Sequence, residues 1–158
     1  MTLNKPKKKT IRTLGEFPDD LRYLPRPKDV LFPLPRATKK AWLRELRSGD
    51  FQQCRGHFRN DNAPNSFDAM GLLLNIIDTK AWTIDHGIYA WNGFSSLLDP
   101  DYSRWSQYLS KTLIKVFQQE VPITKNSALT YQIPSLISSA NDNGTNFNEI
   151  AIWIERYL

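Results

Sequence analysis

Apolar residues recur every three or four positions in several stretches of the chain, which is the pattern of helices that bury one face. The first stretch follows Thr38, a candidate N-cap, and ends before Gly49, a residue suited to the left-handed turn after a helix. The second follows Ser66, another candidate N-cap, and its apolar positions occupy most of the helix surface. We therefore expect this second helix to be central in the fold.

Three further helices are predicted in the second half of the chain. Asp99 and Pro100 have the order of an N-cap and a first-turn proline, and the apolar stripe after them indicates about five turns that end at Pro122. A short helix is expected over residues 134–140. In the last helix, Asn146 and Glu149 have the spacing of a capping box.

Strand character is strongest in one stretch. The turn residues Asp85, His86 and Gly87 are flanked by aromatic and β-branched side chains, which is typical of a hairpin. These flanking residues are Trp82, Ile84, Ile88, Tyr89 and Trp91. Residues 50–64 are polar and rich in turn formers, so they predict a loop or at most a short strand. The expected fold class is α+β, a helix-rich compact single domain with a short β-hairpin.

Basic charge is concentrated near the N-terminus. The chain has 158 residues and a net charge of +5, but residues 1–48 hold thirteen Lys and Arg against five Asp and Glu. The remaining residues are therefore net acidic. Residues 1–36 also contain six of the ten prolines, which remove main-chain donors and favour extended backbone. We predict an extended basic, Pro-rich arm over 1–36 and a helix-rich globular domain over 37–158.

The arm has two parts with different physical character. Its first residues are a lysine cluster that could meet phosphate or an acidic protein surface by Coulomb attraction. Residues 17–35 are too apolar for a free linker, so they must lie on their own domain or on a neighbouring protein. The sequence leaves both placements open. The predicted partner-binding residues are Lys5, Lys7, Lys8, Lys9, Arg12, Phe17, Tyr23, Arg26 and Phe32.

Candidate catalytic residues are few. Cys54 and His57 lie three positions apart, but a thiolate nucleophile also needs an oxyanion site and an orienting third group, which the sequence does not indicate. With His86 they are too few for a structural zinc site, which takes four ligands. No Walker A or dinucleotide-binding glycine motif is present. We predict no enzymatic activity, no cofactor and no metal, and the short apolar runs predict no membrane span.

Three segments together resemble a family of small, mostly uncharacterised proteins of tailed phages and prophages. They are the first helix and its turn (KKAWLRELRSGDFQQCRGHFR, 39–59), the segment YAWNG (89–93) with the following Leu-Asp-Pro helix start and Trp105, and the C-terminal ANDNGTNFNEIAIWIERYL (140–158). That family often has cysteines before its second helix, where this chain has Ser66 to Leu72 without one. The resemblance therefore implies a viral origin, in a virion or the host cytoplasm, but no cysteine or metal chemistry.

Together these features predict a non-catalytic phage accessory protein that docks on a larger protein assembly. The assembly would be a virion, with the protein as a head or tail decoration or adaptor, or a host complex that it inhibits. The arm would extend the contact, because an extended apolar segment offsets its ordering entropy by contact area. The alternative is a nucleic-acid-binding protein whose basic tail makes non-specific phosphate contacts. A small enzyme that uses Cys54 is the third hypothesis.

Overall fold

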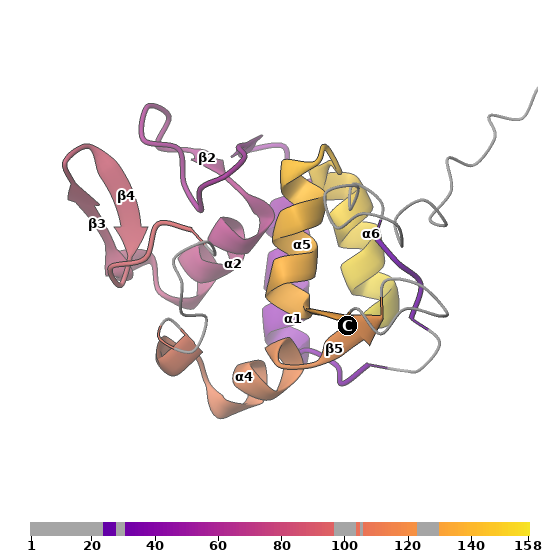
Figure 1. The fold of residues 1–158 in the computed structure, drawn as a ribbon. Coiled ribbons are helices and arrows are strands. Elements are labelled where there is room, and N and C mark those ends of the chain that lie inside the picture. Colours follow the sequence, from indigo (N-terminus) through magenta and orange to yellow (C-terminus); the bar gives the residue numbers. More distant parts are fainter. Residues whose placement is uncertain (1–23, 28–30, 97–103, 105, 123–129) are drawn as a thin grey trace, which may run out of the picture.

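The computed structural model describes residues 24–27, 31–96, 104, 106–122 and 130–158. The first half of the chain forms a helix, two short parallel strands, a central helix and a β-hairpin (Figure 1). The second half forms a 3₁₀ turn, a short helix, a pair of short strands and two longer helices. In order along the chain, the elements are α1 (Arg36–Arg47), β1 (Gln52–Gln53), β2 (Ser66–Phe67), α2 (Ala69–Ile77), η3 (Thr79–Ala81), β3 (Trp82–Asp85), β4 (Ile88–Trp91), η4 (Ser106–Tyr108), α4 (Lys111–Phe117), β5 (Glu120–Pro122), β6 (Thr130–Gln132), α5 (Ile133–Asp142) and α6 (Phe147–Tyr157).

Helix α2 lies at the centre, as predicted. Every residue from Ala69 to Leu74 is buried. Helix α2 packs against α1 and α5, and the C-terminal helix α6 packs against the same two helices (Figure 1). The buried indole of Trp42 in α1 donates to the main-chain oxygen of Ala69 at 2.9 Å. One hydrophobic core therefore joins the helices. The helix-rich α+β class is confirmed.

Both N-caps predicted for the first two helices are wrong. Ser66 belongs to β2, which pairs in parallel with β1, and α2 is capped instead by Asp68, whose Oδ1 accepts from Gly71 N at 2.5 Å. Helix α1 begins two residues before Thr38, because the extended Pro35 (ψ 134°) already offers its carbonyl oxygen to Lys39 N. After α1, Gly49 has a φ of +76°, so its predicted left-handed conformation is confirmed.

The hairpin prediction is confirmed with its turn. Strands β3 and β4 pair antiparallel from Trp82 opposite Trp91 to Asp85 opposite Ile88. The two-residue turn places His86 and Gly87 at φ values of +49° and +80°. Positive φ at both positions defines the turn type whose twist matches that of the paired strands.

The prediction of one long helix that ends at Pro122 is wrong for the residues that the structure describes. Its expected start at Asp99 and Pro100, with Tyr102 and Trp105, lies outside the described residues. Residues 106–108 form a 3₁₀ turn, and the extended Ser110 (φ −62°, ψ 153°) caps a separate helix by accepting from Leu113 N at 3.2 Å. The chain then forms β5, which pairs with β6, two strands that the sequence did not indicate. The apolar residues keep a helical spacing across Ser110, so the sequence pattern does not reveal that the 3₁₀ turn and α4 are separate elements.

The two C-terminal helices match the prediction closely. Helix α5 covers the expected residues and has Pro134 in its first turn. Asn146 Oδ1 accepts from Glu149 N at 2.9 Å, and Glu149 Oε2 accepts from Asn146 N at 3.3 Å, so the capping box is complete. Helix α6 buries Phe147, Ile150, Ala151, Trp153 and Ile154.

The described residues before α1 lie on the body of their own chain. The main-chain oxygen of Pro25 accepts from the indole of Trp153 at 2.6 Å, and Leu34 N donates to the carbonyl oxygen of Leu158 at 2.7 Å. The side chain of Leu34 is only 4% exposed. The sequence leaves open whether this segment lies on its own domain or on a neighbouring protein. Residues 24–27 and 31–35 lie on their own domain. Among the described residues, no helix has both the length and the apolar run needed to cross a membrane.

Candidate functional site

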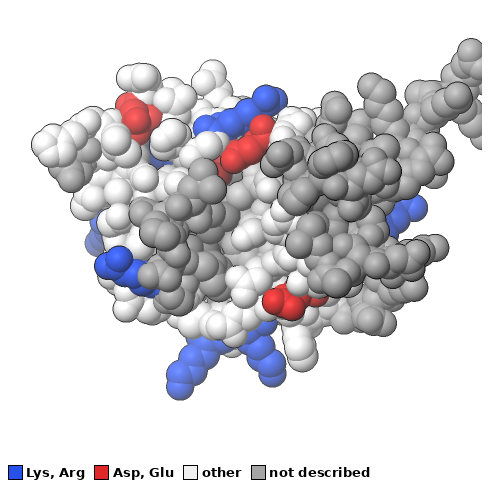
Figure 2. All heavy atoms as spheres, viewed as in Figure 1, with Lys and Arg blue, Asp and Glu red and all other residues white. Residues whose placement is uncertain are grey.

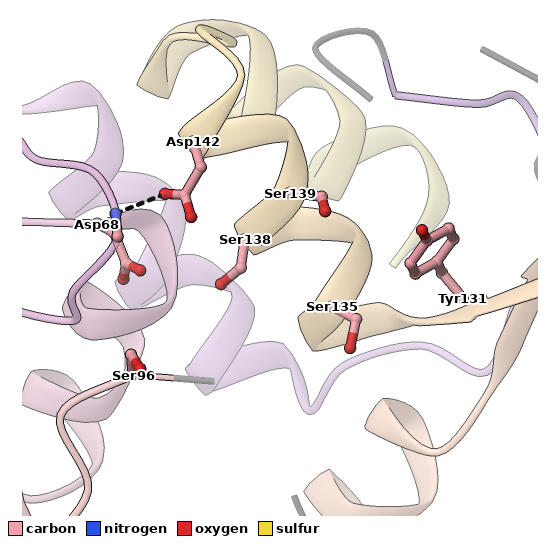
Figure 3. Close-up of a pocket in the computed structure, with 8 residues that line it drawn as sticks. Asp68, Ser96, Tyr131, Ser135, Ser138, Ser139 and Asp142 are labelled. Atoms are coloured by element: carbon pink, nitrogen blue, oxygen red, sulfur yellow. Dashed lines mark hydrogen bonds between the residues drawn. The ribbon is translucent and has the colours of Figure 1, made fainter. Parts of the chain in front are cut away.

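A pocket of about 230 Å³ lies between α5 and the junction of β2 with α2 (Figure 3). Its walls combine two carboxylates, four serine hydroxyls and one phenol. The described residues that line it are Gly56, Asp68, Ser96, Tyr131, Ser135, Ser138, Ser139 and Asp142. None of them is a Lys, Arg or His, so the described lining provides no positively charged side chain.

One face of α5 supplies half of the lining. Ser135, Ser138, Ser139 and Asp142 follow the i, i+3, i+4, i+7 spacing that places residues on one side of a helix. Ser138 is only 9% exposed, and its Oγ has no hydrogen-bond partner among the described residues. Figure 3 shows this hydroxyl directed from α5 toward the side of the pocket that holds Asp68. The polar stripe was a readable signal that the sequence analysis missed.

Asp68 forms the opposite wall and is 3% exposed. Its carboxylate is held at the first turn of α2, where Oδ1 accepts from Gly71 N. The pKa of this carboxyl is raised to about 8, mainly by burial and also by the negative charge of Asp142, while the N–H groups of Gly71 and Met70 act in the opposite direction. If this carboxyl group were ionised, it would have no positively charged partner among the described residues.

Asp142 stands at the end of α5. Its Oδ1 accepts from the main-chain N–H of Gly56 at 2.9 Å and from the side-chain amide of Asn141 at 3.2 Å. The dashed line in Figure 3 marks the bond to Gly56 N, and the Asp142 side chain extends from α5 toward the side of the pocket that holds Asp68. Gly56 has a φ of +78°, so its backbone favours glycine.

The fully buried side chain of Asn141 fixes the pocket wall. Its Oδ1 accepts from Gln53 Nε2 at 2.7 Å and from Ala69 N at 3.1 Å, and its Nδ2 donates to Cys54 O at 2.8 Å. One amide thus ties α5 to β1 and to the first residue of α2. Because each of these buried polar groups needs a partner, the arrangement fixes the relative position of the three segments.

The cysteine has no contact with an imidazole. Cys54 Sγ lies 3.3 Å from the main-chain oxygen of His57, to which its thiol donates, and the His57 side chain is exposed. The pKa of the Cys54 thiol is raised to about 12, mainly by burial and also by the charges of Asp68 and Asp142. The thiol is therefore protonated at neutral pH. Among the described residues, no group of three or more His, Cys, Asp and Glu side chains is arranged to hold a metal ion.

A second candidate surface is the hairpin, which projects from the helices (Figure 1). The outer edge of β4 is closed, because Tyr89 N donates to Asp61 Oδ1 at 3.0 Å and Trp91 N donates to Phe94 O at 2.8 Å. On β3, Ile84 is 62% exposed, and within the described part of the chain no group outside the hairpin bonds to its main chain. We refer to this side of β3 as the Ile84 edge.

The root of the hairpin is fixed by Arg59. Its guanidinium carbon lies 4.1 Å from the ring centroid of Tyr89, 5.4 Å from that of Trp82 and 4.9 Å from that of Phe67. A guanidinium group stacked on aromatic rings in this way is an attractive contact. The hairpin is thereby joined to β2 and presents its edge in one orientation.

Two of the predicted partner-binding residues can be placed. Arg26 is exposed, and Phe32 is 55% exposed, with Lys115 Nζ 4.9 Å from its ring centroid and its main-chain oxygen accepting from Gln119 Nε2 at 3.0 Å. The other seven lie outside the described residues: Lys5, Lys7, Lys8, Lys9, Arg12, Phe17 and Tyr23. On the face drawn in Figure 2, the described Lys and Arg side chains are scattered rather than gathered in one patch.

The fold is that of a small, helix-rich α+β domain, and comparison with known proteins assigns its family. A family model, the domain of unknown function DUF8296, matches residues 35–158, so the chain belongs to this family. No curated protein and no solved structure matches the chain. The match begins at Pro35, the residue that precedes α1.

Proposed function

We propose that this protein is a non-catalytic accessory protein that docks on a larger protein assembly, and that the Ile84 edge is its docking surface. The observation that carries the proposal is the contrast between the two edges of the hairpin. The β4 edge is closed by Asp61 and Phe94, whereas the β3 edge receives no hydrogen bond from described residues outside the hairpin and bears an exposed isoleucine.

The register of the hairpin supports strand addition at this edge. In a two-residue hairpin the pair next to the turn exchanges both main-chain hydrogen bonds, and bonded and non-bonded pairs then alternate. Asp85 and Ile88 flank the turn, so Ile84 and Tyr89 form a non-bonded pair. The N–H and C=O groups of Ile84 therefore point outward, where an extended segment of a partner protein can pair with them.

The chemistry of the edge indicates the kind of partner segment. A partner strand would gain two main-chain hydrogen bonds at Ile84 and would cover its exposed side chain. An exposed isoleucine on a projecting two-stranded hairpin adds nothing to the core of its own chain. We propose an extended, β-branched or aromatic segment of another protein as the occupant.

The Pro-rich, partly apolar arm favours a virion component, such as a head or tail decoration or adaptor, over an inhibitor of a host complex, because such an arm suits contact with a large surface. Docking by a short edge alone would be weak, because an isolated strand pairing of this length buries little area. The exposed Arg26 and Phe32 and the preceding arm residues would then extend the contact.

Site-specific cross-linking tests this proposal. A photoreactive amino acid is placed at position 84 and, as a matched control, at Ile152, which is 50% exposed on α6. We expect one discrete protein adduct at position 84 in cells that contain the partner assembly, and none at position 152. A homodimer adduct at position 84, or the same adducts at both positions, would contradict docking at this edge.

Nucleic-acid binding is the second candidate, and the net charge of +8 in residues 1–48 favours it. Such binding would be salt-dependent, since each phosphate contact releases a counterion. Retention on DNA that weakens steeply with salt, together with no discrete adduct at position 84, would favour this function over docking.

A further inference from the structure

We propose that the pocket between α5 and the β2–α2 junction is a binding site for a primary alkylammonium group. The ammonium group would lie between the carboxyl groups of Asp68 and Asp142 and would donate to the Ser138 hydroxyl. This inference does not depend on the hairpin, since it is carried by the charge, the burial and the unpaired hydroxyl of the pocket.

The first step of the argument is charge. Two carboxyl groups share the pocket, and no Lys, Arg or His is among the described residues that line it. Each carboxylate receives main-chain N–H donors, Asp68 from Gly71 and Asp142 from Gly56, but neither forms an ion pair within the described part of the chain. Burial and the charge of Asp142 favour the protonated form of Asp68, and a bound cation would offset both effects and favour the ionised form.

The second step is the orphaned hydroxyl. Ser138 Oγ is buried without a partner among the described residues, and Figure 3 shows it directed toward the Asp68 side of the pocket. A buried polar group without a partner is uncommon and calls for a specific explanation. A hydroxyl oxygen has two lone pairs and can accept from an ammonium group, which provides that explanation.

The third step is size. A volume of about 230 Å³ is several times what one water occupies in the liquid, about 30 Å³. A bare metal ion would leave most of this space unfilled, and the described residues offer no metal-binding group of three or more ligands. An ammonium group on a short alkyl chain fits both the space and the donor requirements, since it has three donors and no acceptor.

The ammonium group can come from two sources, which an experiment can distinguish. The ligand is a free amine, or it is the lysine side chain of a protein segment inserted end-on. We therefore use butylamine as the probe for a free amine and a capped Gly-Lys-Gly peptide as the probe for a side chain. Butanol and butyrate serve as neutral and anionic controls of equal length.

Binding is followed by amide resonances of Gly56, Ser138 and Asp142 in the full chain. We expect saturable shifts with butylamine or with the peptide, and none with butanol or butyrate. Binding of the peptide alone indicates a protein side chain, whereas binding of butylamine alone indicates a free amine. If neither probe shifts these resonances, or if butanol shifts them equally, the proposal is wrong.

Variants separate a binding role from a structural one. Asp142→Asn keeps the acceptor for Gly56 N and removes the charge, and it should weaken amine binding by about tenfold or more, the usual loss for a hydrogen bond to a charged group. Asp50→Asn makes the same charge change at an exposed position outside the pocket and should leave binding within about twofold.

Ser138→Ala provides a second readout. Removing a hydroxyl without a partner should not lower the melting temperature, but it should weaken butylamine binding. Unchanged amine binding in both Asp142→Asn and Ser138→Ala would contradict the proposed site, even if both variants fold as the parent does.

Discussion

The side-chain amide of Gln53 donates to Oδ1 of Asn141 at 2.7 Å, across 88 positions of the chain. The same Gln53 amide group bonds at both ends, since its Nε2 also donates to Thr145 O at 2.8 Å and its Oε1 accepts from Phe147 N at 3.1 Å. A two-residue strand is thereby attached to the end of α5 and the start of α6. The pair fixes the corner of the molecule at which the acidic pocket lies.

Replacing Asn141 should destabilise the fold strongly. Asn141→Ala leaves Cys54 O and Ala69 N without the partner that Asn141 provides and removes one of the two acceptors of Gln53 Nε2, and each unpaired buried group costs about 1–3 kcal/mol. We expect a loss of about 3 kcal/mol or more in denaturant melts. Asn143→Ala, at an exposed position two residues later, is the control. Equal stability of the two variants would mean that the network does not contribute.

Gly71 should tolerate no side chain. A Cβ atom at this position would lie 1.8 Å from the main-chain oxygen of Phe58, whose oxygen also accepts from Asp68 N at 3.1 Å. Because the contact is with backbone, Gly71→Ala should cost about 3 kcal/mol or more, at the upper end of overpacking losses. A change within about 0.5 kcal/mol, in the range of an ordinary surface substitution, would show that the Phe58 segment does not lie over α2.

The raised pKa of Asp68 makes a prediction about pH. The folded chain keeps this proton up to about pH 8, whereas the unfolded chain releases it near 3.8. Since the folded state then holds more protons, this group's contribution to stability is present below the unfolded pKa and is lost as pH rises toward about 8.

Asp68→Asn tests this dependence, because asparagine also serves as an N-cap. Relative to the parent, the variant should gain stability as pH rises from about 4 to about 8. The free energy of unfolding is measured across this range, with Asp50→Asn as the control for an exposed acid. A difference between variant and parent that is independent of pH would contradict the raised pKa.

The capping box of α6 should contribute measurably. Asn146→Ala removes the acceptor for Glu149 N and should cost about 0.5–2 kcal/mol, the usual range for an N-cap. Asn148→Ala, exposed in the first turn of the same helix, should change stability by less than about 0.5 kcal/mol. Equal effects of the two substitutions in thermal or denaturant melts would argue against the cap.

The sequence predicted local features well and distant ones poorly. The hairpin turn at His86 and Gly87 and the cap at Asn146 depend on neighbouring residues, and both were found. Asp68 was missed as the cap of α2 because Ser66 is an equally good capping residue, and only pairing with Gln52 assigns Ser66 to a strand. Strands β5 and β6 have three residues each, too few for a periodic pattern.

The candidate site was only partly predictable. The serine stripe of α5 has a helical spacing that is visible in the sequence, but a polar stripe on a helix normally faces solvent. That it faces Asp68 follows from the packing of α5 on α2, which brings together residues about 70 positions apart. The Ile84 edge was equally hidden, because Asp61, which closes the other edge, is 28 positions from Tyr89.

The central claim, protein docking through the Ile84 edge, is tested most directly by measuring how much tagged chain co-sediments with its assembly from lysates of cells that contain the partner. The variants compared are Ile84→Lys, the matched exposed control Ile152→Lys, and the joint replacement of Lys5, Lys7, Lys8 and Lys9 by Gln. We expect Ile84→Lys to lose most of the association, because a lysine on an edge strand disfavours the addition of another strand, and the other two variants to retain it. Loss of association with the four-lysine variant and full retention with Ile84→Lys would contradict the claim and favour nucleic-acid binding.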